Sequence, residues 1–395
     1  MGTTAVVWDD SVTEYDFGPG HPMGPLRLDL TARLSRALGV LDTVEIVCPR
    51  VASDELLQTV HTPEYIAAVR AAAADPAAAD ERFGLGTEDD PAFAAMHEAS
   101  ARVVDGTVQM CERVWTGRSE HGVNFTGGLH HARPDSASGF CIYNDIAVGI
   151  RWLLDHGAER VAYVDLDVHH GDGVEATFWD DPRVLTISIH ENGRTLFPGT
   201  GWPGDIGGQH AEGSVVNIAL PPGTGDSAWL RALNSVAVPL VTAFKPDVLV
   251  SQHGCDTHRE DPLAHLAITV DAQRYAADAV HRLAHQVCQG RWVALGGGGY
   301  ELIDVVPRAW THLTAIAAHH PIAADVEIPA SWRDDVQRRF GRPGPARMGD
   351  LPAKDLPIWV QPWSMGFNPD NGIDRAIMAT RQAVFAHHGL DPWFD

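Results

Sequence analysis

Short apolar runs alternate along the chain with longer segments in which apolar residues recur every three to four positions. The short runs predict strands at residues 4–8, 44–49, 122–125, 160–168, 184–190, 214–221, 247–254 and 291–295. The longer segments predict helices at residues 25–41, 53–60, 62–74, 90–115, 144–157, 227–244 and 271–290. Strands that alternate with helices are typical of a parallel sheet with helices on both faces. The sequence therefore predicts an α/β fold.

Residues that commonly begin or end helices lie at several of these boundaries. Ser53 precedes one helical segment, and Thr62 followed by Pro63 suits the cap and first turn of the next. Asp90 and Pro91 predict the start of the long helix over 90–115, and Gly157 the end of the helix over 144–157.

The alternating pattern weakens at about residue 320. Residues 321–395 are rich in Pro and Gly, including the stretch "RRFGRPGPARMGDLPAKDLP". We expect residues 1–320 to form the main, catalytic domain and residues 321–395 to be a C-terminal extension packed on that domain.

Composition narrows the classes of function. The 395-residue chain has 29 basic and 52 acidic residues, a formal net charge of −23, which argues against a nucleic-acid partner. Its five cysteines are scattered and form no CxxC pair, as expected in a reducing compartment. No apolar run approaches the ~20 residues of a membrane span, and the first residues lack the pattern of a signal peptide. We therefore expect a soluble, cytoplasmic protein.

Acids, histidines and a tyrosine follow four of the predicted buried strands. Ligands of such sheets bind beyond the carboxyl ends of the strands, so these side chains are expected at one rim. They are His130 and His131 after 122–125, Asp165, Asp167, His169 and Asp172 along and after 160–168, Asp256 after 247–254, and Tyr300 after 291–295.

The stretch "YVDLDVHHGDG" (163–173) holds the densest group of charges. If the strand continues, Asp165, Asp167 and His169 share one face, because side chains alternate with period two. Neighbouring carboxylates repel unless a cation neutralises them. Asp167 and His169, with Asp256 as a third ligand, suit a catalytic Zn²⁺, and Fe²⁺ is chemically compatible. The alternative is a solvated acidic turn. No chemistry is assigned to His170.

The adjacent His130 and His131 would each need an orienting carboxylate to act as acid or base, and Asp165 and Asp172 could supply one each. The alternative is a surface histidine pair. The segment "LGGGGY" lacks the Gly-Lys-Ser/Thr ending of a phosphate loop. Its glycines would leave Tyr300 on a mobile segment, where the phenol could donate to a developing oxyanion. The alternative is a core tyrosine.

Phe140 and Phe197 each stand beside a glycine. Ordinary core packing is one interpretation. The other is a channel in which two rings hold a narrow aliphatic chain.

Seven ordered segments together carry a resemblance to a known family. They are "GPGHPM", "GGLHHARPDSASGFCIYND", "YVDLDVHHGDGVEATF", "TISIH", "FPGTG", "GCDTHREDPLAHL" and "LGGGGYEL". Over about residues 5 to 318 the chain resembles the histone deacetylase superfamily, in particular zinc-dependent class I members and bacterial acetoin-utilisation deacetylases. The resemblance implies an arginase/deacetylase-type fold with a central, mostly parallel sheet of about eight strands. It also implies hydrolysis of N-ε-acetyl-lysine in proteins, which releases acetate.

The resemblance assigns roles to individual residues. Zinc would be held by Asp167, His169 and Asp256, and catalysis would use the pairs His130–Asp165 and His131–Asp172 with Tyr300. The substrate would contact Asp89, Gly139, Phe140, Phe197 and Leu263, although "GTEDDP" also allows Glu88 or Asp90 in place of Asp89. A structural K⁺ would be bound by Asp165, Asp167, His169, Ser188 and the carbonyl of Ile189. A second monovalent site would lie near Phe178, Asp181 and Val184, and Arg27 would line an internal channel.

Acetylated proteins, for example acyl-CoA synthetases, or small acetylated amines are the expected partners. Three alternatives share parts of the pattern. They are an acetylpolyamine amidohydrolase, a two-manganese ureohydrolase of the arginase type, and a non-catalytic acyl-lysine binding protein. The absence of an evident long insertion near residues 15–30 argues against an acetylpolyamine amidohydrolase. A two-manganese site needs more carboxylates at the strand ends than "GCDTHRED" supplies, which argues against a ureohydrolase. The complete set of His, Asp and Tyr residues argues against a non-catalytic binding protein.

Overall fold

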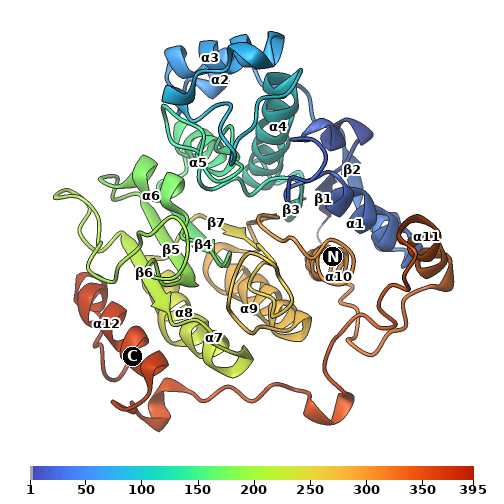
Figure 1. The fold of residues 1–395 in the computed structure, drawn as a ribbon. Coiled ribbons are helices and arrows are strands. Elements are labelled where there is room, and N and C mark those ends of the chain that lie inside the picture. The colour runs from blue at the N-terminus through green and yellow to red at the C-terminus, as the bar shows by residue number, and fades with distance from the viewer. Residues whose placement is uncertain (1–2) are drawn as a thin grey trace.

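A single parallel sheet organises the molecule. The structure, a computed structural model, describes residues 3–395. In that part of the chain eight strands lie in the order β2-β1-β3-β8-β7-β4-β5-β6, and all adjacent pairs are parallel (Figure 1). The strands are β1 (Thr4–Val7), β2 (Glu45–Val47), β3 (His121–Asn124), β4 (Val161–Asp165), β5 (Val184–Glu191), β6 (Val215–Leu220), β7 (Val248–Gln252) and β8 (Trp292–Leu295).

Helices cover both faces of the sheet. In Figure 1, α3, α4 and α5 lie above it and α7, α8 and α9 below it. The helices are α1 (Leu26–Ala37), α2 (Asp54–Leu57), α3 (Pro63–Ala74), α4 (Met96–Trp115), α5 (Asp145–Asp155), α6 (Asp172–Phe178), α7 (Asp226–Ala232), α8 (Val238–Phe244), α9 (Val270–Cys288), α10 (Val306–Ala317), α11 (Ala330–Phe340) and α12 (Gly372–Val384).

The strands read as continuous apolar runs because both of their faces are buried. In β4, Val164 packs into the core shared with α9, whereas its neighbour Tyr163 packs into the core shared with α4 and α5. All five residues of β4 are buried. The sheet is thus a rigid platform between two hydrophobic cores.

Several predicted helix boundaries are confirmed. The hydroxyl of Ser53 accepts a hydrogen bond from the backbone N–H of Leu56 at 3.3 Å, and the hydroxyl of Thr62 accepts one from Tyr65 N–H at 3.3 Å. Helix α5 ends at Asp155, and Gly157 follows with a φ of 101°, which glycine adopts readily.

One predicted helix start is wrong. The helix expected to start at Asp90 begins only at Met96, because Ala95 has a left-handed φ of 61° and interrupts the pattern. The helix predicted over 227–244 is confirmed in extent, because α7, a π-helical turn at Leu233–Ala237 and α8 follow one another without a break.

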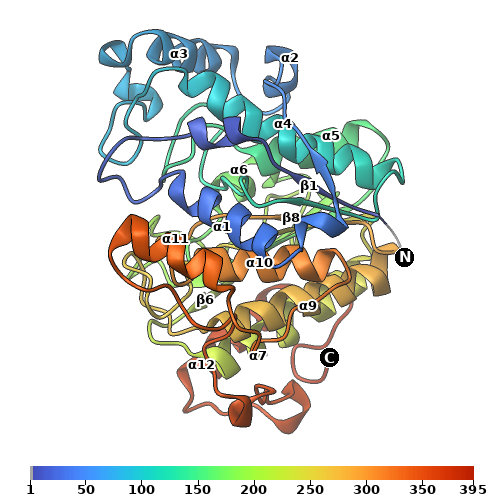
Figure 2. The same cartoon turned by 90° about the vertical axis from the view of Figure 1, so that its right-hand side faces the viewer.

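The C-terminal segment crosses the surface and returns to the sheet. Helix α11 lies beside α1 (Figure 2), where the Trp332 indole donates to the carbonyl of Leu30 at 3.2 Å. Helix α12 packs along β6, and a buried ion pair joins Arg231 to Asp374 at 3.0 Å. These contacts tie residues beyond 320 to the main body, while the domain boundary itself stays a prediction. Within residues 3–395 no helix is both long and apolar enough to cross a membrane.

Candidate active site

The chemistry-bearing residues gather at the carboxyl ends of β3, β8, β7 and β4, four consecutive neighbours in the sheet. His130 and His131 follow β3, Asp167 and His169 follow β4, and Asp256 follows β7. Because parallel strands end at the same edge, loops that are far apart in sequence deliver these side chains to one place.

Asp167, His169 and Asp256 form a compact group that could hold a metal ion. One potential ligand atom from each residue lies within 4.8 Å of the others, and all three residues are buried. His169 Nδ1 lies 3.1 Å from a carboxylate oxygen of each aspartate. Burial, and then the charge of Asp167, raise the pKa of Asp256 to about 8. A divalent cation would remove this repulsion, so the donor set fits Zn²⁺ or Fe²⁺.

Local hydrogen bonds, rather than strand geometry, aim these ligands. The strand predicted over 160–168 ends earlier, at Asp165, so the condition for Asp167 and His169 to share a strand face is not met. Beyond it, the N–H groups of Asp167 and His169 donate to the carboxylates two residues earlier, at 3.1 and 3.0 Å. Val168 N–H donates to Asp256 Oδ1 at 3.0 Å. The carboxylates thus stabilise the loop conformation by accepting hydrogen bonds from its backbone N–H groups. The alternation of side chains along a strand does not predict this conformation.

The glycine-rich loop after β8 approaches this group closely. Gly298 N–H donates to Asp167 Oδ2 at 2.8 Å, and a Cβ at Gly298 would overlap the carboxylate of Asp256. Gln252, at the end of β7, donates to the same oxygen of Asp167 at 2.6 Å. The sequence pattern did not single out Gln252, although its position at the end of a predicted buried strand could have indicated it.

Two His–Asp pairs stand beside the potential metal ligands. His130 Nδ1 lies 2.7 Å from Asp165, and His131 Nδ1 lies 2.7 Å from Asp172. Sequence reasoning did not find the residues that support these aspartates. The Tyr163 hydroxyl donates to Asp165 at 2.6 Å, and Arg133 donates to Asp172 at 3.0 Å.

The environment separates the two imidazoles electrostatically. Burial favours the neutral form of His130, but the carboxylates of Asp165 and Asp167 outweigh it and raise its pKa to about 9. Burial, together with the charge of His130, lowers the pKa of His131 to about 4. At neutral pH the pair therefore holds one positive charge, on His130.

A cavity of about 210 Å³ opens above these groups. All five residues expected to contact substrate line it, together with three of the candidate catalytic and metal-binding residues and with Leu196, which was missed. The lining residues are Asp89, His131, Gly139, Phe140, His169, Leu196, Phe197, Leu263 and Tyr300.

Tyr300 reaches this cavity from the glycine-rich loop. Its N–H donates to Asp261 at 2.8 Å, and its ring packs edge-on against Phe140 with centroids 5.8 Å apart. Burial, followed by the charges of Asp256 and Asp167, raises the pKa of the Tyr300 phenol. The phenol is thus a protonated hydrogen-bond donor at neutral pH.

The three acids considered for substrate binding have different environments. Asp89 is exposed and lines the cavity, and Glu88 is exposed but does not line it. Asp90 is buried, and burial raises its pKa to about 8. The geometry therefore favours Asp89 over its two neighbours.

Phe140 is held in an unusual conformation. Its φ of 68° lies in the left-handed region, and so does the φ of 56° at Gly139. The Tyr15 hydroxyl donates to the Phe140 carbonyl at 2.8 Å, and the His21 ring packs edge-on against Phe140 at 4.6 Å. Tyr15 and His21 were also missed, because no pattern in their local sequence indicates a distant contact.

The remaining predicted residues lie behind or beside the cavity. Ser188 stands opposite Asp165 in the β4–β5 register and contacts His190 at 2.8 Å. Ile189 follows in β5, and the segment around Phe178, Asp181 and Val184 connects α6 to β5. Both monovalent-cation sites stay predictions.

Arg27 is buried and donates to the carbonyl of Gly297 at 2.6 Å. It does not line the described cavity, so its role in a channel also stays a prediction. His170 contacts Thr200 and Glu175, each at 2.8 Å, and is not part of the potential metal-binding group.

Comparisons with known proteins agree with this arrangement. The family profile described as "Histone deacetylase domain" matches residues 21–317. The "Acetoin utilization protein AcuC" of Bacillus subtilis (strain 168) is 43% identical over 350 residues, 85% of this chain and 90% of the relative. The protein of the same name from Staphylococcus xylosus is 36% identical over 369 residues, 89% of this chain and 96% of the relative.

The eight-stranded parallel sheet, with paired histidines and acids at one edge, is that of a deacetylase with the α/β arginase/deacetylase fold. The chain belongs to the histone deacetylase family and is similar to the AcuC proteins of Bacillus subtilis and Staphylococcus xylosus. The predicted fold class and the family resemblance are therefore confirmed.

Proposed function

We propose that this protein is a zinc-dependent lysine deacetylase, which hydrolyses N-ε-acetyl-lysine in proteins to acetate and free lysine. One observation carries the proposal. His131, His169 and Tyr300 line the same cavity as Phe140 and Phe197, so polar reactive groups meet an aromatic-lined space. A lysine side chain is an aliphatic chain with a polar amide at its end, which matches that combination.

Asp167, His169 and Asp256 would hold the metal ion, which when bound would polarise the acyl oxygen and acidify a water molecule. His131 is neutral at neutral pH and faces the cavity, so it is the residue suited to take the proton from that water. Asp172 fixes the orientation of its ring through Nδ1. His130 stays charged and supplies electrostatic stabilisation.

Tyr300 completes the set of catalytic residues. Its protonated phenol would donate a hydrogen bond to the acyl oxygen as negative charge develops there. The water oxygen bonds to the acyl carbon, the C–N bond of the amide breaks to leave acetate, and a histidine passes the proton gained from water to the departing lysine amine. Phe140 and Phe197 would flank the methylene chain, and Asp89 at the rim would bind the backbone of the substrate.

The names of the relatives suggest which acetylated proteins to test. Those relatives are called acetoin utilization proteins, a name that refers to the use of a small metabolite and not to chromatin. Acetylated metabolic enzymes such as acyl-CoA synthetases are therefore our proposed partners, in preference to histones.

An acetate-release assay tests this function. The full chain, freed of metal and reloaded with Zn²⁺ or Fe²⁺, would be given acetyl-lysine peptides, longer acyl-lysine peptides and acetylspermidine. We expect release from acetyl-lysine peptide and its loss in Asp256→Ala. Faster turnover of acetylspermidine would identify an acetylpolyamine amidohydrolase instead. Peptide binding without acetate release would identify a non-catalytic binding protein.

A further inference from the structure

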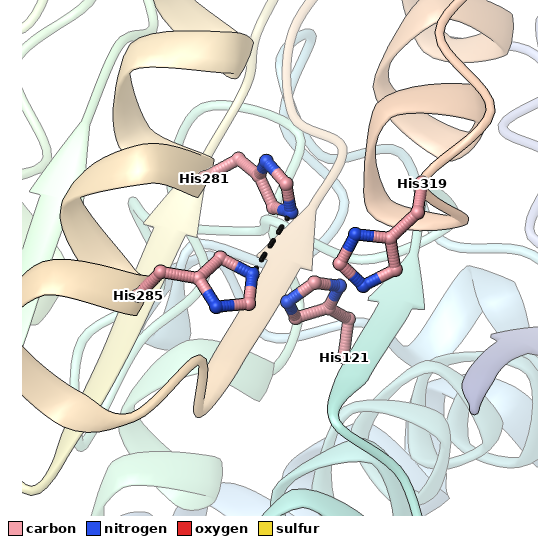
Figure 3. Close-up of side chains that lie close together, drawn as sticks. All are labelled: His121, His281, His285 and His319. Atoms are coloured by element: carbon pink, nitrogen blue, oxygen red, sulfur yellow. Dashed lines mark hydrogen bonds between the residues drawn. The ribbon is translucent and has the colours of Figure 1, made fainter. Parts of the chain in front are cut away.

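Four histidines converge at the edge of the sheet opposite the candidate active site. His121 is the first residue of β3, His281 and His285 lie four residues apart on α9, and His319 follows α10. Figure 3 shows their rings pointing toward one another from three separate elements. The active-site loop leaves the other end of β3, so the two clusters occupy opposite ends of that strand.

The nitrogen atoms of this cluster are close enough to share one ion. One ring nitrogen from each histidine lies within 4.8 Å of those of the other three. His281 Nε2 and His285 Nε2 are 3.2 Å apart. The His121 ring centroid lies 4.8 Å from that of His281 and 4.7 Å from that of His319. The cluster is therefore compact, as a single coordination sphere requires.

His121 supplies an independent indication that a ligand belongs here. The residue is completely buried, and its Nδ1 contacts the carbonyl of Ala317 at 2.7 Å, so Nδ1 carries the proton. Nε2 is then a bare acceptor, and it is buried without a hydrogen-bond partner among the described residues. Buried polar atoms are nearly always paired, and a metal ion at the centre of the cluster would pair this one.

The electrostatic surroundings favour a cation. The Glu120 carboxylate lies 3.2 Å from His319 Nε2 and 3.7 Å from His285 Nδ1, in the position of a carboxylate that orients metal-bound imidazoles. His285 and His319 lie at the C-terminal ends of α9 and α10, where the helix dipole is negative.

We propose that His121, His281, His285 and His319 bind a divalent transition-metal ion, Zn²⁺ by preference, at a second and structural site. Four protein ligands leave no open position for substrate, which is typical of structural zinc and unlike catalytic zinc. The ion would join the start of β3 to the C-terminal ends of α9 and α10. The proposal is independent of the deacetylase function, since none of the four residues lines the active-site cavity.

Zinc counting on the full, tag-free chain tests the proposal. After chelation, reloading and gel filtration, elemental analysis should give two Zn²⁺ per chain for the wild type. His285→Gln changes an exposed ligand and should give one, with acetate release unchanged. The neighbouring His320 is exposed and outside the cluster, so His320→Gln is the matched control and should keep two.

A second measurement isolates the new site. In Asp256→Ala, added Zn²⁺ should still raise the melting temperature, and X-ray absorption should show nitrogen ligands at about 2.0–2.1 Å. Both signals should disappear in Asp256→Ala/His285→Gln. The proposal is overturned if His285→Gln retains the wild-type zinc content, whatever that content is, because any extra zinc would then be an adventitious ion only. If Asp256→Ala does not fold, the comparison of wild type with His285→Gln alone still decides.

Discussion

The Nε2 atoms of His130 and His131 lie 3.0 Å apart, so the two imidazoles share a hydrogen bond. Neighbouring carboxylates raise the pKa of His130 to about 9, whereas burial and the charge of His130 lower the pKa of His131 to about 4. The two adjacent residues therefore differ in protonation at neutral pH, which their identical side chains alone would not suggest.

The first prediction follows from this difference. His131→Ala should lower kcat by about 10²–10⁴, the usual contribution of a general base, while bound metal stays at the wild-type level. His130→Ala should be less damaging, because it removes a stabilising charge rather than the proton acceptor. Steady-state kinetics with parallel metal analysis provides the check. A larger loss in His130→Ala would reverse the assignment.

The second prediction concerns the phenol of Tyr300. Tyr300→Phe keeps the ring that packs against Phe140 but removes the donor. We expect kcat to fall by about 10²–10³, as for loss of one oxyanion donor, with folding and metal content preserved. Full activity in this variant would exclude the oxyanion role.

The third prediction uses the close approach of Gly298 to the potential metal ligands. Gly298→Ala places a methyl group against the Asp256 carboxylate and should weaken metal binding by about 10–100-fold. Gly204→Ala is the matched control, since a Cβ there meets no atom within 4 Å. Competition with a chromophoric chelator measures both affinities. Equal affinities in the two variants would contradict the arrangement.

The fourth prediction separates the acids at the rim. Asp89→Asn should lower kcat/KM for an acetyl-lysine peptide by about tenfold. This factor is near the lower end of the free energy that a hydrogen bond to a charged group contributes. Glu88→Gln should have little effect, because Glu88 does not line the cavity. The comparison requires only kinetics on one peptide. The reverse ranking would move the substrate contact to Glu88.

The fifth prediction concerns stability and acid. His61 is buried, and its Nε2 accepts a hydrogen bond from Asn144 N–H at 3.0 Å, which requires the neutral form. Burial lowers its pKa from 6.5 to about 4. Between these values the unfolded chain binds a proton that the folded chain does not, so the free energy of unfolding falls as the pH decreases from about 6.5 to about 4.

His61→Gln removes this titration. Its stability deficit relative to the wild type should shrink by up to about 3 kcal/mol between pH 7 and pH 4, at ~1.4 kcal/mol for each unit of pKa. Urea unfolding at several pH values measures the difference, with the exposed His320→Gln as control. A deficit that does not change with pH would disprove the effect.

Much of the fold could be predicted because its causes are local. Buried parallel strands such as β4 produce continuous apolar runs, and Ser53 and Thr62 cap helices through their own neighbouring N–H groups. The start of the long helix was predicted too early, because Asp90 and Pro91 are residue types that commonly begin helices. The left-handed backbone of Ala95 has no such signature in the sequence.

The sequence by itself determined that the acids and histidines after β3, β4 and β7 would meet at one place, because the carboxyl ends of parallel strands lie at one edge of the sheet. Only the tertiary structure decided how the protonation states of those residues differ. Burial and neighbouring charges give His130 and His131 opposite pKa shifts, and both depend on distances between separate loops. The four-histidine cluster is a similar case. The spacing of His281 and His285 indicates a shared helix face, but only the packing of α9 and α10 against β3 brings His121 and His319 to them.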